Sequence, residues 1–473
     1  MNDSNKNKLK KALGLFDLIL LNIVAIVGLR WTANAASIGP GSIILWLLAM
    51  LVFFIPSALV VMDLASHRPR EGGIYPWTRE ACGDFNGFIC GFFYWVNNII
   101  YYPNLLIFLS GIFLYVGGAR FLHLETNSLY FAIFSLVLLW IAIISNIVGL
   151  KTGKWLQNIG SAGTWITALV LIILAGIAWK KFGIAQDFSQ NIMPDFKDLT
   201  VWAVFSNLCF SFAGMELQGC MGEEIDEPGK NIPRAIFISG IAIVLIYIFS
   251  TLALMVALPA NEINVISGIV QVIARVAEKV NLVWMGPVIA LFLTIGGLGG
   301  CGAWLAGTAR IPFTIGIDNY LPEWFARIHP RWGTPVNALL AQGIFSSLFI
   351  IMAAVGSKVK ESYMLLLGAT VILYFIPYVY MFIDFLILRK KDGEIIMKTP
   401  AILGYIGILT TVFAIAMAII PPPETKNVLL YELKLLGGPV FFFILAYFLY
   451  SRGRKKKAKG KTADDKSFLE GNG

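Results

Sequence analysis

The sequence predicts an all-α integral membrane protein with twelve transmembrane helices. Of its 473 residues, 58% are hydrophobic and only 14% are charged, and the mean hydropathy is +0.75. Soluble domains carry about 25% charged residues. A membrane-spanning helix needs about 20 apolar residues. Twelve such segments follow one another with short connections, at 15–37, 42–65, 86–115, 127–149, 155–179, 200–221, 235–258, 283–309, 336–356, 362–388, 400–421 and 436–451.

Two of these segments are interrupted in the same way. The first contains Gly28 followed two positions later by Arg30, and the sixth contains Gly214 followed two positions later by Glu216. A charge at membrane depth is costly and is usually kept for function. Paired glycine-interrupted helices at matching positions of two halves indicate the substrate site of a transporter. The sequence therefore predicts a carrier of a small solute.

The lysine and arginine residues predict the orientation. With the N-terminus in the cytoplasm, 26 of the 37 lie on the cytoplasmic side and 10 lie outside, as the positive-inside rule requires. We therefore expect a multi-pass protein of the cell membrane (plasma or bacterial inner) with both termini cytoplasmic. The basic run 452–457 then anchors the chain to anionic lipid rather than to nucleic acid. The first segment lacks a small-residue cleavage site, so we expect it to stay as a span.

Four polar motifs lie in or beside the predicted spans. They are Glu71-Gly72-Gly73-x-Tyr75, Phe212-x-Gly214-x-Glu216, the acidic-Pro-Lys-Asn-x-Pro-Arg loop at 226–234, and Gly333-Thr334-Pro335. With these motifs in this order, the chain resembles the amino acid–polyamine–organocation (APC) superfamily from Leu15 to about Tyr450. Within it, the chain is most similar to bacterial antiporters of the arginine/agmatine and glutamate/GABA kind.

The resemblance implies two inverted repeats of five helices, with helices 1 and 6 discontinuous and two peripheral helices added. The repeats would cover 15–180 and 200–388, joined by an outer loop at 181–199. The peripheral spans would cover 400–451, between a cytoplasmic N-terminus at 1–14 and a basic cytoplasmic tail at 452–473. Substrate would lie between the broken helices, whose N–H groups suit a carboxylate and whose carbonyls suit an ammonium.

The implied function is a secondary transporter that moves amino acids by alternating access, as an antiporter or exchanger. Its partners would be an amino acid or amine and the lipid bilayer, with no nucleic acid and with a homodimer as the candidate assembly. The implied substrate-binding residues lie on spans one, three, six and eight: Ala25, Ile26, Val27, Gly28, Leu29, Arg30, Tyr94, Tyr102, Phe210, Ser211, Phe212, Ala213, Gly214 and Cys301. Phe210 would act as a gate and Glu216 as a proton sensor. The alternative for Glu216 is a structural hydrogen bond to the backbone of span one or six.

The chain departs from the family where the carboxylate should bind. The family's Gly-x-Gly motif aligns with Ala25-Ile26-Val27, and the glycine is delayed to Gly28. Branched residues suit an open backbone poorly. Either the break moves outward to Gly28, or the carboxylate is held by Arg30, whose planar fork suits bidentate binding. Arg30 could instead reach water or pair with an acid.

Other functions fit less well. A polyamine carrier would need acids in its pocket, and Arg30 argues against it. Relatives that use protons often carry a lysine on span five, where this chain has Thr164. Exchange is thus favoured, and proton- or sodium-coupled symport stays open. A channel or a sensor would need a filter or a soluble domain. We expect no enzyme, metal or cofactor, because the three histidines lie in loops and the five cysteines form no cluster. The GxGxxG at 297–302 lies in an apolar span, which favours helix packing over nucleotide binding.

Overall fold

A computed structural model describes residues 11–188, 192–263, 268–356, 359–393, 399–421 and 427–470. These residues contain eleven helices long and apolar enough to cross a membrane, and a twelfth candidate span formed by a bent pair of helices. The only β structure in the described ranges is two isolated bridges. The twelve spans predicted from the sequence are therefore confirmed. Helices dominate because a helix satisfies its own backbone hydrogen bonds in lipid.

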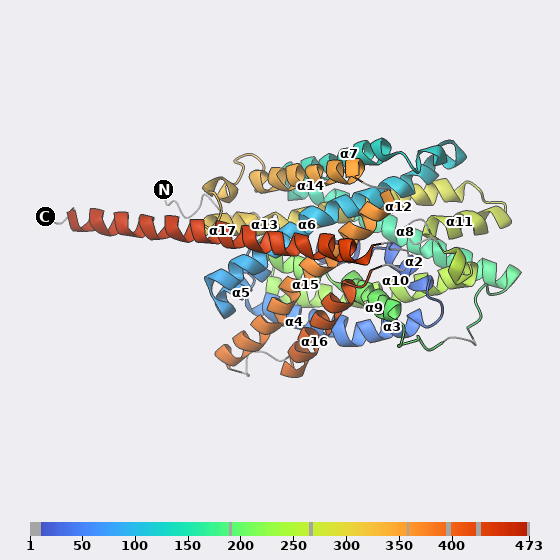
Figure 1. The fold of residues 1–473 in the computed structure, drawn as a ribbon, viewed down its shortest axis with the longest axis horizontal. Coiled ribbons are helices and arrows are strands. Elements are labelled where there is room, and N and C mark those ends of the chain that lie inside the picture. The colour runs from blue at the N-terminus through green and yellow to red at the C-terminus, as the bar shows by residue number, and fades with distance from the viewer. Residues whose placement is uncertain are drawn as a thin grey trace.

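The spans follow one another along the chain. They are α1 (Leu15–Ile26) with α2 (Arg30–Ala36), α3 (Ser42–Ala49) with α4 (Ile55–His67), α6 (Asp84–Phe113), α7 (Ser128–Ile147), α8 (Leu150–Phe182), α9 (Leu199–Phe212) with the 3₁₀ turn η5 (Met215–Cys220), α10 (Pro228–Ala257), α12 (Met285–Thr308) with α13 (Arg310–Ile317), α14 (Val336–Gly356), α15 (Val359–Asp392), α16 (Ala401–Ala418) and α17 (Val428–Glu470). Two shorter helices lie in loops, α5 (Ile74–Cys82) and α11 (Gly268–Lys279). Figure 1 shows α5 and α13 at one end of the bundle and α11 at the other.

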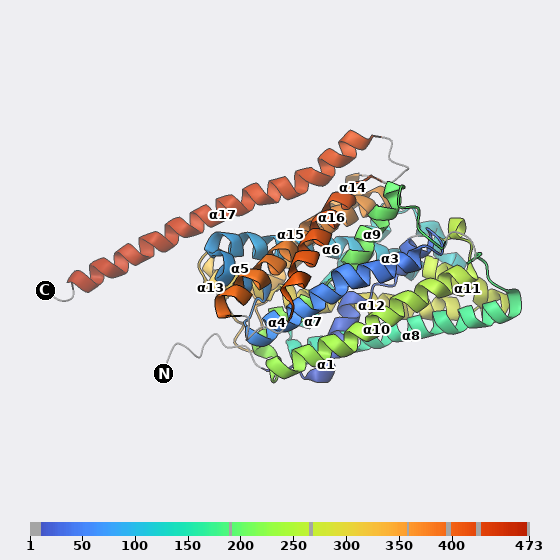
Figure 2. The same ribbon diagram turned by 90° about the horizontal axis from the view of Figure 1, so that it is seen from below.

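Burial separates an inner set of helices from an outer set. In α6, 72% of the most apolar window is buried inside the protein, and in α17 only 11% is. Figure 2 shows α17 running along the outside of the bundle and continuing past its end. The last two spans are therefore peripheral, and the exposed apolar side chains of α17 face the bilayer.

Helices α8 and α12 approach unusually closely through glycines. A Cβ on Gly160 would lie 2.6 Å from the Cα atom of Gly299, and a Cβ on Gly163 would lie 2.7 Å from the Phe292 carbonyl oxygen. Distances this short exclude any side chain. The small residues of 297–302 thus serve helix packing, as the sequence predicted.

Candidate functional site

Two breaks in the helices face each other at the centre of the bundle. The first lies between α1 and α2, which meet at an angle of 47°. The second lies at Ala213 and Gly214, between α9 and η5. Gly214 has a φ of +130°, and a Cβ there would lie 2.8 Å from the Ile26 side chain. Only glycine fits this position, because it alone combines the positive φ with the close approach.

The first break is centred on Gly28, as one of the two sequence-based alternatives predicted. Helix α1 continues through Ala25 and Ile26, and α2 begins at Arg30. The unwinding that the family motif would place at Ala25-Ile26-Val27 is thus moved to the C-terminal side of that motif, at Val27, Gly28 and Leu29. Alanine and isoleucine keep the helix intact, and the glycine allows the turn.

One tyrosine ties the two breaks together. The Tyr247 hydroxyl of α10 accepts a hydrogen bond from the Gly28 N–H (3.1 Å) and donates toward the carbonyls of Ile26 (2.6 Å) and Ser211 (2.9 Å). The indole N–H of Trp304 donates to the Ala25 carbonyl at 2.8 Å. Backbone groups released by the breaks are therefore satisfied by side chains, as irregular backbone at membrane depth requires.

A cavity lies between the breaks. Its lining is mostly aromatic and amide: Ala25, Ile26, Trp31, Asn97, Asn98, Tyr101, Phe210, Ser211, Ala213, Trp304 and Tyr374. The Phe210 ring contacts Trp31 and Tyr374 edge-on, with centroid distances of 5.5 and 5.4 Å. The side-chain carbonyl oxygens of Asn97 and Asn98 are buried without a hydrogen-bond partner. Two free acceptors beside aromatic rings suit an ammonium group.

A second cavity adjoins the first, and Ala25 and Tyr101 line both. Arg30 lines the second cavity together with Val27, Gly28 and Leu29. Its side chain is buried, and its Nη1 donates to the Asn104 side chain at 3.1 Å. Arg30 is 3% exposed, and in the described part of the chain it forms no ion pair with an acid. The residues lining the two cavities include no aspartate or glutamate.

Glu216 lies just beyond the second break, fully buried. Its carboxylate accepts hydrogen bonds from the hydroxyls of Tyr94 (2.7 Å), Tyr374 and Tyr378 and from the Gly214 N–H (3.2 Å). These donors come from α6, α15 and the break itself. The alternative for Glu216 was a structural hydrogen bond to the backbone of span one or six. The bond from the Gly214 N–H is such a bond to span six, and three tyrosine hydroxyls donate to the same carboxylate.

Several predicted site residues lie outside both cavities. Tyr94 points to Glu216, and the Tyr102 hydroxyl bonds to Thr308 at 2.8 Å. Phe212 stacks on Phe54 with a centroid distance of 4.7 Å. Cys301 is buried but lines neither cavity. Trp304, three residues further along the same helix, lines the first cavity instead.

Sequence reasoning did not single out Trp31, Trp304, Tyr374 or Tyr247. Trp304 could have been predicted from Cys301, because residues three apart lie on the same face of a helix. Trp31 directly follows Arg30, and Tyr374 and Tyr247 belong to segments with no polar motif of their own. The five cysteines are free thiols, as expected.

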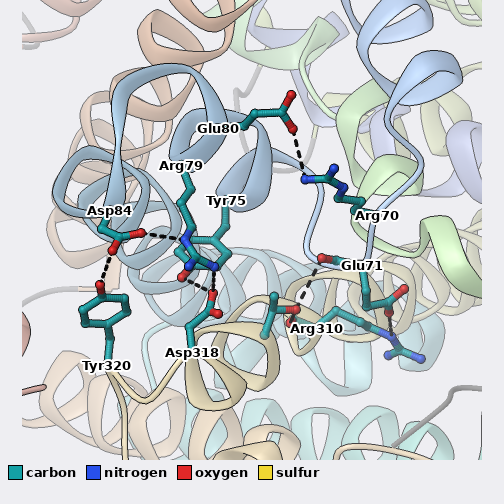
Figure 3. Close-up of polar contacts among 10 residues, drawn as sticks. Arg70, Glu71, Tyr75, Arg79, Glu80, Asp84, Arg310, Asp318 and Tyr320 are labelled. Atoms are coloured by element: carbon teal, nitrogen blue, oxygen red, sulfur yellow. Dashed lines mark hydrogen bonds and ion pairs between the residues drawn. The ribbon is translucent and has the colours of Figure 1, made fainter. Parts of the chain in front are cut away.

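The motif loops meet at the end of the molecule that carries α5 and α13. Arg310 donates to both carboxylate oxygens of Glu224, at 2.8 and 3.1 Å, and its Nε lies 3.5 Å from Glu71. Burial, with the Glu224 charge beside it, holds the pKa of Glu71 well above its usual range. Figure 3 shows Arg310 reaching Glu71, and, close by, Arg79, which reaches Asp84 at 2.7 Å.

The glycines of the same motif let the loops pass each other. Gly73 has a φ of +45°, and a Cβ there would lie 2.8 Å from the Cys220 backbone nitrogen. The Gly72 N–H donates to the Cys220 carbonyl at 2.9 Å. The backbone N–H groups of Ala12 and Leu13 in turn donate to the Glu224 carbonyl. The loops after spans two, six and eight and the segment before span one are therefore joined at this end.

Twelve candidate spans arranged around a pair of broken helices define a multi-pass membrane transporter. The model of the amino acid permease family matches residues 13–445, so the chain belongs to that family. This confirms the placement in the APC superfamily that the motifs predicted. The protein is thus an amino acid transporter of that family, and the relatives it matches are named as transporters rather than enzymes.

Three relatives match nearly the whole chain. An uncharacterized transporter of Legionella pneumophila is 30% identical over 93% of this chain and 97% of its own. A probable agmatine/putrescine antiporter of Lactococcus lactis is 24% identical over 94% of this chain and 95% of its own. A glutamate/gamma-aminobutyrate antiporter of Lactococcus lactis is 25% identical over 87% of this chain and 84% of its own.

Proposed function

We propose that this protein exchanges amino acids across the cell membrane by alternating access around the cavity between the two breaks. The observation that carries the proposal is the pair of free amide oxygens, on Asn97 and Asn98, in an aromatic cavity bounded by both broken helices. Two of the relatives are named as antiporters, which supports exchange. A carrier of this kind alternates by moving one group of helices against the other around a fixed site.

We assign roles to the predicted residues as follows. Ala25, Ile26, Phe210, Ser211 and Ala213 contact the substrate, with Phe210 as the gate. Val27, Gly28, Leu29 and Arg30 extend the site into the second cavity. Gly214 allows the second break, and Glu216 senses protons with Tyr94 as a partner. We give Tyr102, Phe212 and Cys301 supporting positions outside the cavity.

The orientation and the division into repeats are part of the proposal. The two inverted repeats are 15–180 and 200–388, and both termini are cytoplasmic because 26 of the 37 basic residues then lie inside. In this orientation, the network of Arg310, Glu224 and Glu71 closes the cytoplasmic end. Thr164, which lines the second cavity, brings no charge that could stand in for a coupling cation, and this favours exchange over symport.

Counterflow in liposomes tests the proposal. Purified protein is reconstituted and supplied with a panel of radiolabelled amino acids, with and without the same solute inside. We expect uptake only into preloaded vesicles, and none into protein-free vesicles. Uptake into empty vesicles driven by a sodium or proton gradient would instead identify a symporter, and no uptake of any amino acid would overturn the proposal. Light scattering on the purified protein before reconstitution distinguishes the homodimer from the monomer.

A further inference from the structure

Arg30 is a buried cation that has no anion beside it. Its side chain lies in the middle of the bundle, 3% exposed, and its Nε and Nη2 atoms are buried without a hydrogen-bond partner. In the described part of the chain it forms no ion pair. A buried charge that is left without a partner strongly destabilises a protein. A position this costly calls for an anion at some step of the protein's cycle.

The surroundings of Arg30 offset only part of that cost. Its guanidinium carbon lies 4.5 Å from the ring centre of Trp31 and 5.5 Å from that of Tyr101. Asn104 occupies Nη1. Aromatic rings attract a cation but carry no net negative charge. The edge formed by Nε and Nη2 therefore remains without an acceptor.

That edge has the geometry that binds a carboxylate. Nε and Nη2 lie on the same side of the planar guanidinium, so their N–H groups point in parallel toward two acceptors. The same protein uses this edge at another buried arginine. Arg310 holds Glu224 in this way, with Nε and Nη2 donating to its two oxygens at 2.8 and 3.1 Å.

Space for an anion lies beside Arg30 in the second cavity. Glycines of α12 form part of its wall (Gly296, Gly297 and Gly300), and the rest of the wall beside Arg30 is Gly28, Thr164, Tyr101 and apolar side chains. No acid among the described residues lines this cavity, so the anion must come from outside. Because Ala25 and Tyr101 line both cavities, one small solute can touch the amide oxygens of the first and Arg30 in the second.

We propose that Arg30 and its cavity form a carboxylate subsite, which restricts the substrates to solutes that carry a carboxylate as well as an ammonium group. This inference rests on the proposed function and deepens it. The carrier therefore takes amino acids and rejects amines such as agmatine or putrescine, although one relative is named for exchanging those amines.

Binding to the purified protein tests the subsite separately from transport. Competition against a radiolabelled amino acid compares three matched ligands: the amino acid, its carboxamide and its decarboxylated amine. We expect both analogues to bind about 10- to 150-fold more weakly, the range that corresponds to losing a hydrogen bond to a charged group. Equal binding of the amine would overturn the proposal.

Three variants assign the effect to Arg30. Arg30→Met should lower affinity for the amino acid within the same range and abolish its preference over the amine, and Arg30→Lys should lie between. Asn104→Asp places a carboxylate of the same size 3.1 Å from Nη1, so it should compete with the substrate and weaken binding by about tenfold. Arg275→Met removes an exposed arginine paired with Glu262 and should bind as the unchanged protein does.

The ligand competition, the variants and the counterflow assay together separate the outcomes. If Arg30→Met misfolds, Asn104→Asp still decides, because wild-type affinity in that variant would overturn the subsite. If replacing chloride by gluconate strengthens amino acid binding but the carboxamide binds equally well, the site belongs to a free anion and the substrate inference fails. If binding shows the carboxylate preference but counterflow shows no exchange, the proposed function fails and the subsite stands.

Discussion

At the scale of single residues, Glu216 concentrates more hydrogen-bond donors than any other acid described above. Three tyrosine hydroxyls and one backbone N–H converge on this fully buried carboxylate. Because the donors come from α6, α15 and the second break, the charge on this carboxylate acts on the relative position of all three. In the proposed proton-sensing role of Glu216, a proton on this carboxyl would remove acceptors from the tyrosines and loosen those elements together.

We therefore expect Glu216→Gln to fold and to flatten the pH dependence of exchange. Glutamine has the same shape but cannot gain or lose a proton, so a step controlled by that carboxyl becomes independent of pH. The measurement is the counterflow rate from acidic to neutral pH. Tyr378→Phe serves as a control, because it removes one donor and keeps the carboxyl, and it should retain a pH dependence. An unchanged profile in well-folded Glu216→Gln would reduce Glu216 to a structural partner.

The sequence predicted the position of Glu216 but not its partners. An acid two residues after a glycine in an apolar span is visible in the sequence, because such residues are rare in lipid. Tyr374 and Tyr378 lie about 160 positions away and follow no motif. Cys301 was predicted at the cavity from the resemblance to the family, but Trp304 lines the cavity instead. A helix shows which residues share a face, but it does not show which turn of that face meets the cavity.

At the scale of elements, the sequence predicted the spans well and left the first break open. Twelve runs of about 20 apolar residues leave little choice of structure, since only helices satisfy the backbone in lipid without forming a barrel. The break was undecided because Ala25-Ile26-Val27 and Gly28 gave conflicting signals. The structure resolves the conflict through Tyr247, whose hydroxyl accepts from Gly28 and which belongs to a helix more than 200 residues later.

The contact between α8 and α12 gives a test at this scale. We expect Gly160→Ala to destabilise the protein by about 1–3 kcal/mol, the range for overpacking a tight interface, because its Cβ would lie 2.6 Å from the Gly299 backbone. Gly176→Ala on the same helix is the matched control, since a Cβ there meets nothing within 4 Å. Thermal unfolding in detergent should separate the two variants. Equal stability would mean that α8 and α12 can move apart at no cost.

At the scale of the whole molecule, the central cavities and the network of Arg310 are linked by span six. Its break lines the first cavity, and the loop that follows it carries Glu224 to Arg310 and Glu71. The buried side chains of Glu71 and Glu224 share one cation, Arg310. This arrangement is therefore most favourable when one of the two acids carries a proton. The pKa of Glu71 is raised first by burial and then by repulsion from Glu224.

The sign of the pH effect follows from that shift. A carboxyl whose pKa is raised in one arrangement stabilises it fully below the ordinary pKa of glutamate, and the effect is lost as pH rises through the raised value. We therefore expect acid to favour the joined end of the molecule and alkali to open it. Hydrogen–deuterium exchange of residues 68–75, corrected for intrinsic rates, should be slower at low pH, because the joined arrangement holds the Gly72 N–H in a hydrogen bond to the Cys220 carbonyl. Glu71→Gln resembles the protonated form and should keep exchange slow at every pH. Glu227→Gln removes an exposed acid paired with Lys230 and should leave the pH profile unchanged, so a profile of Glu71→Gln that matches this control would show that the network does not respond to protons.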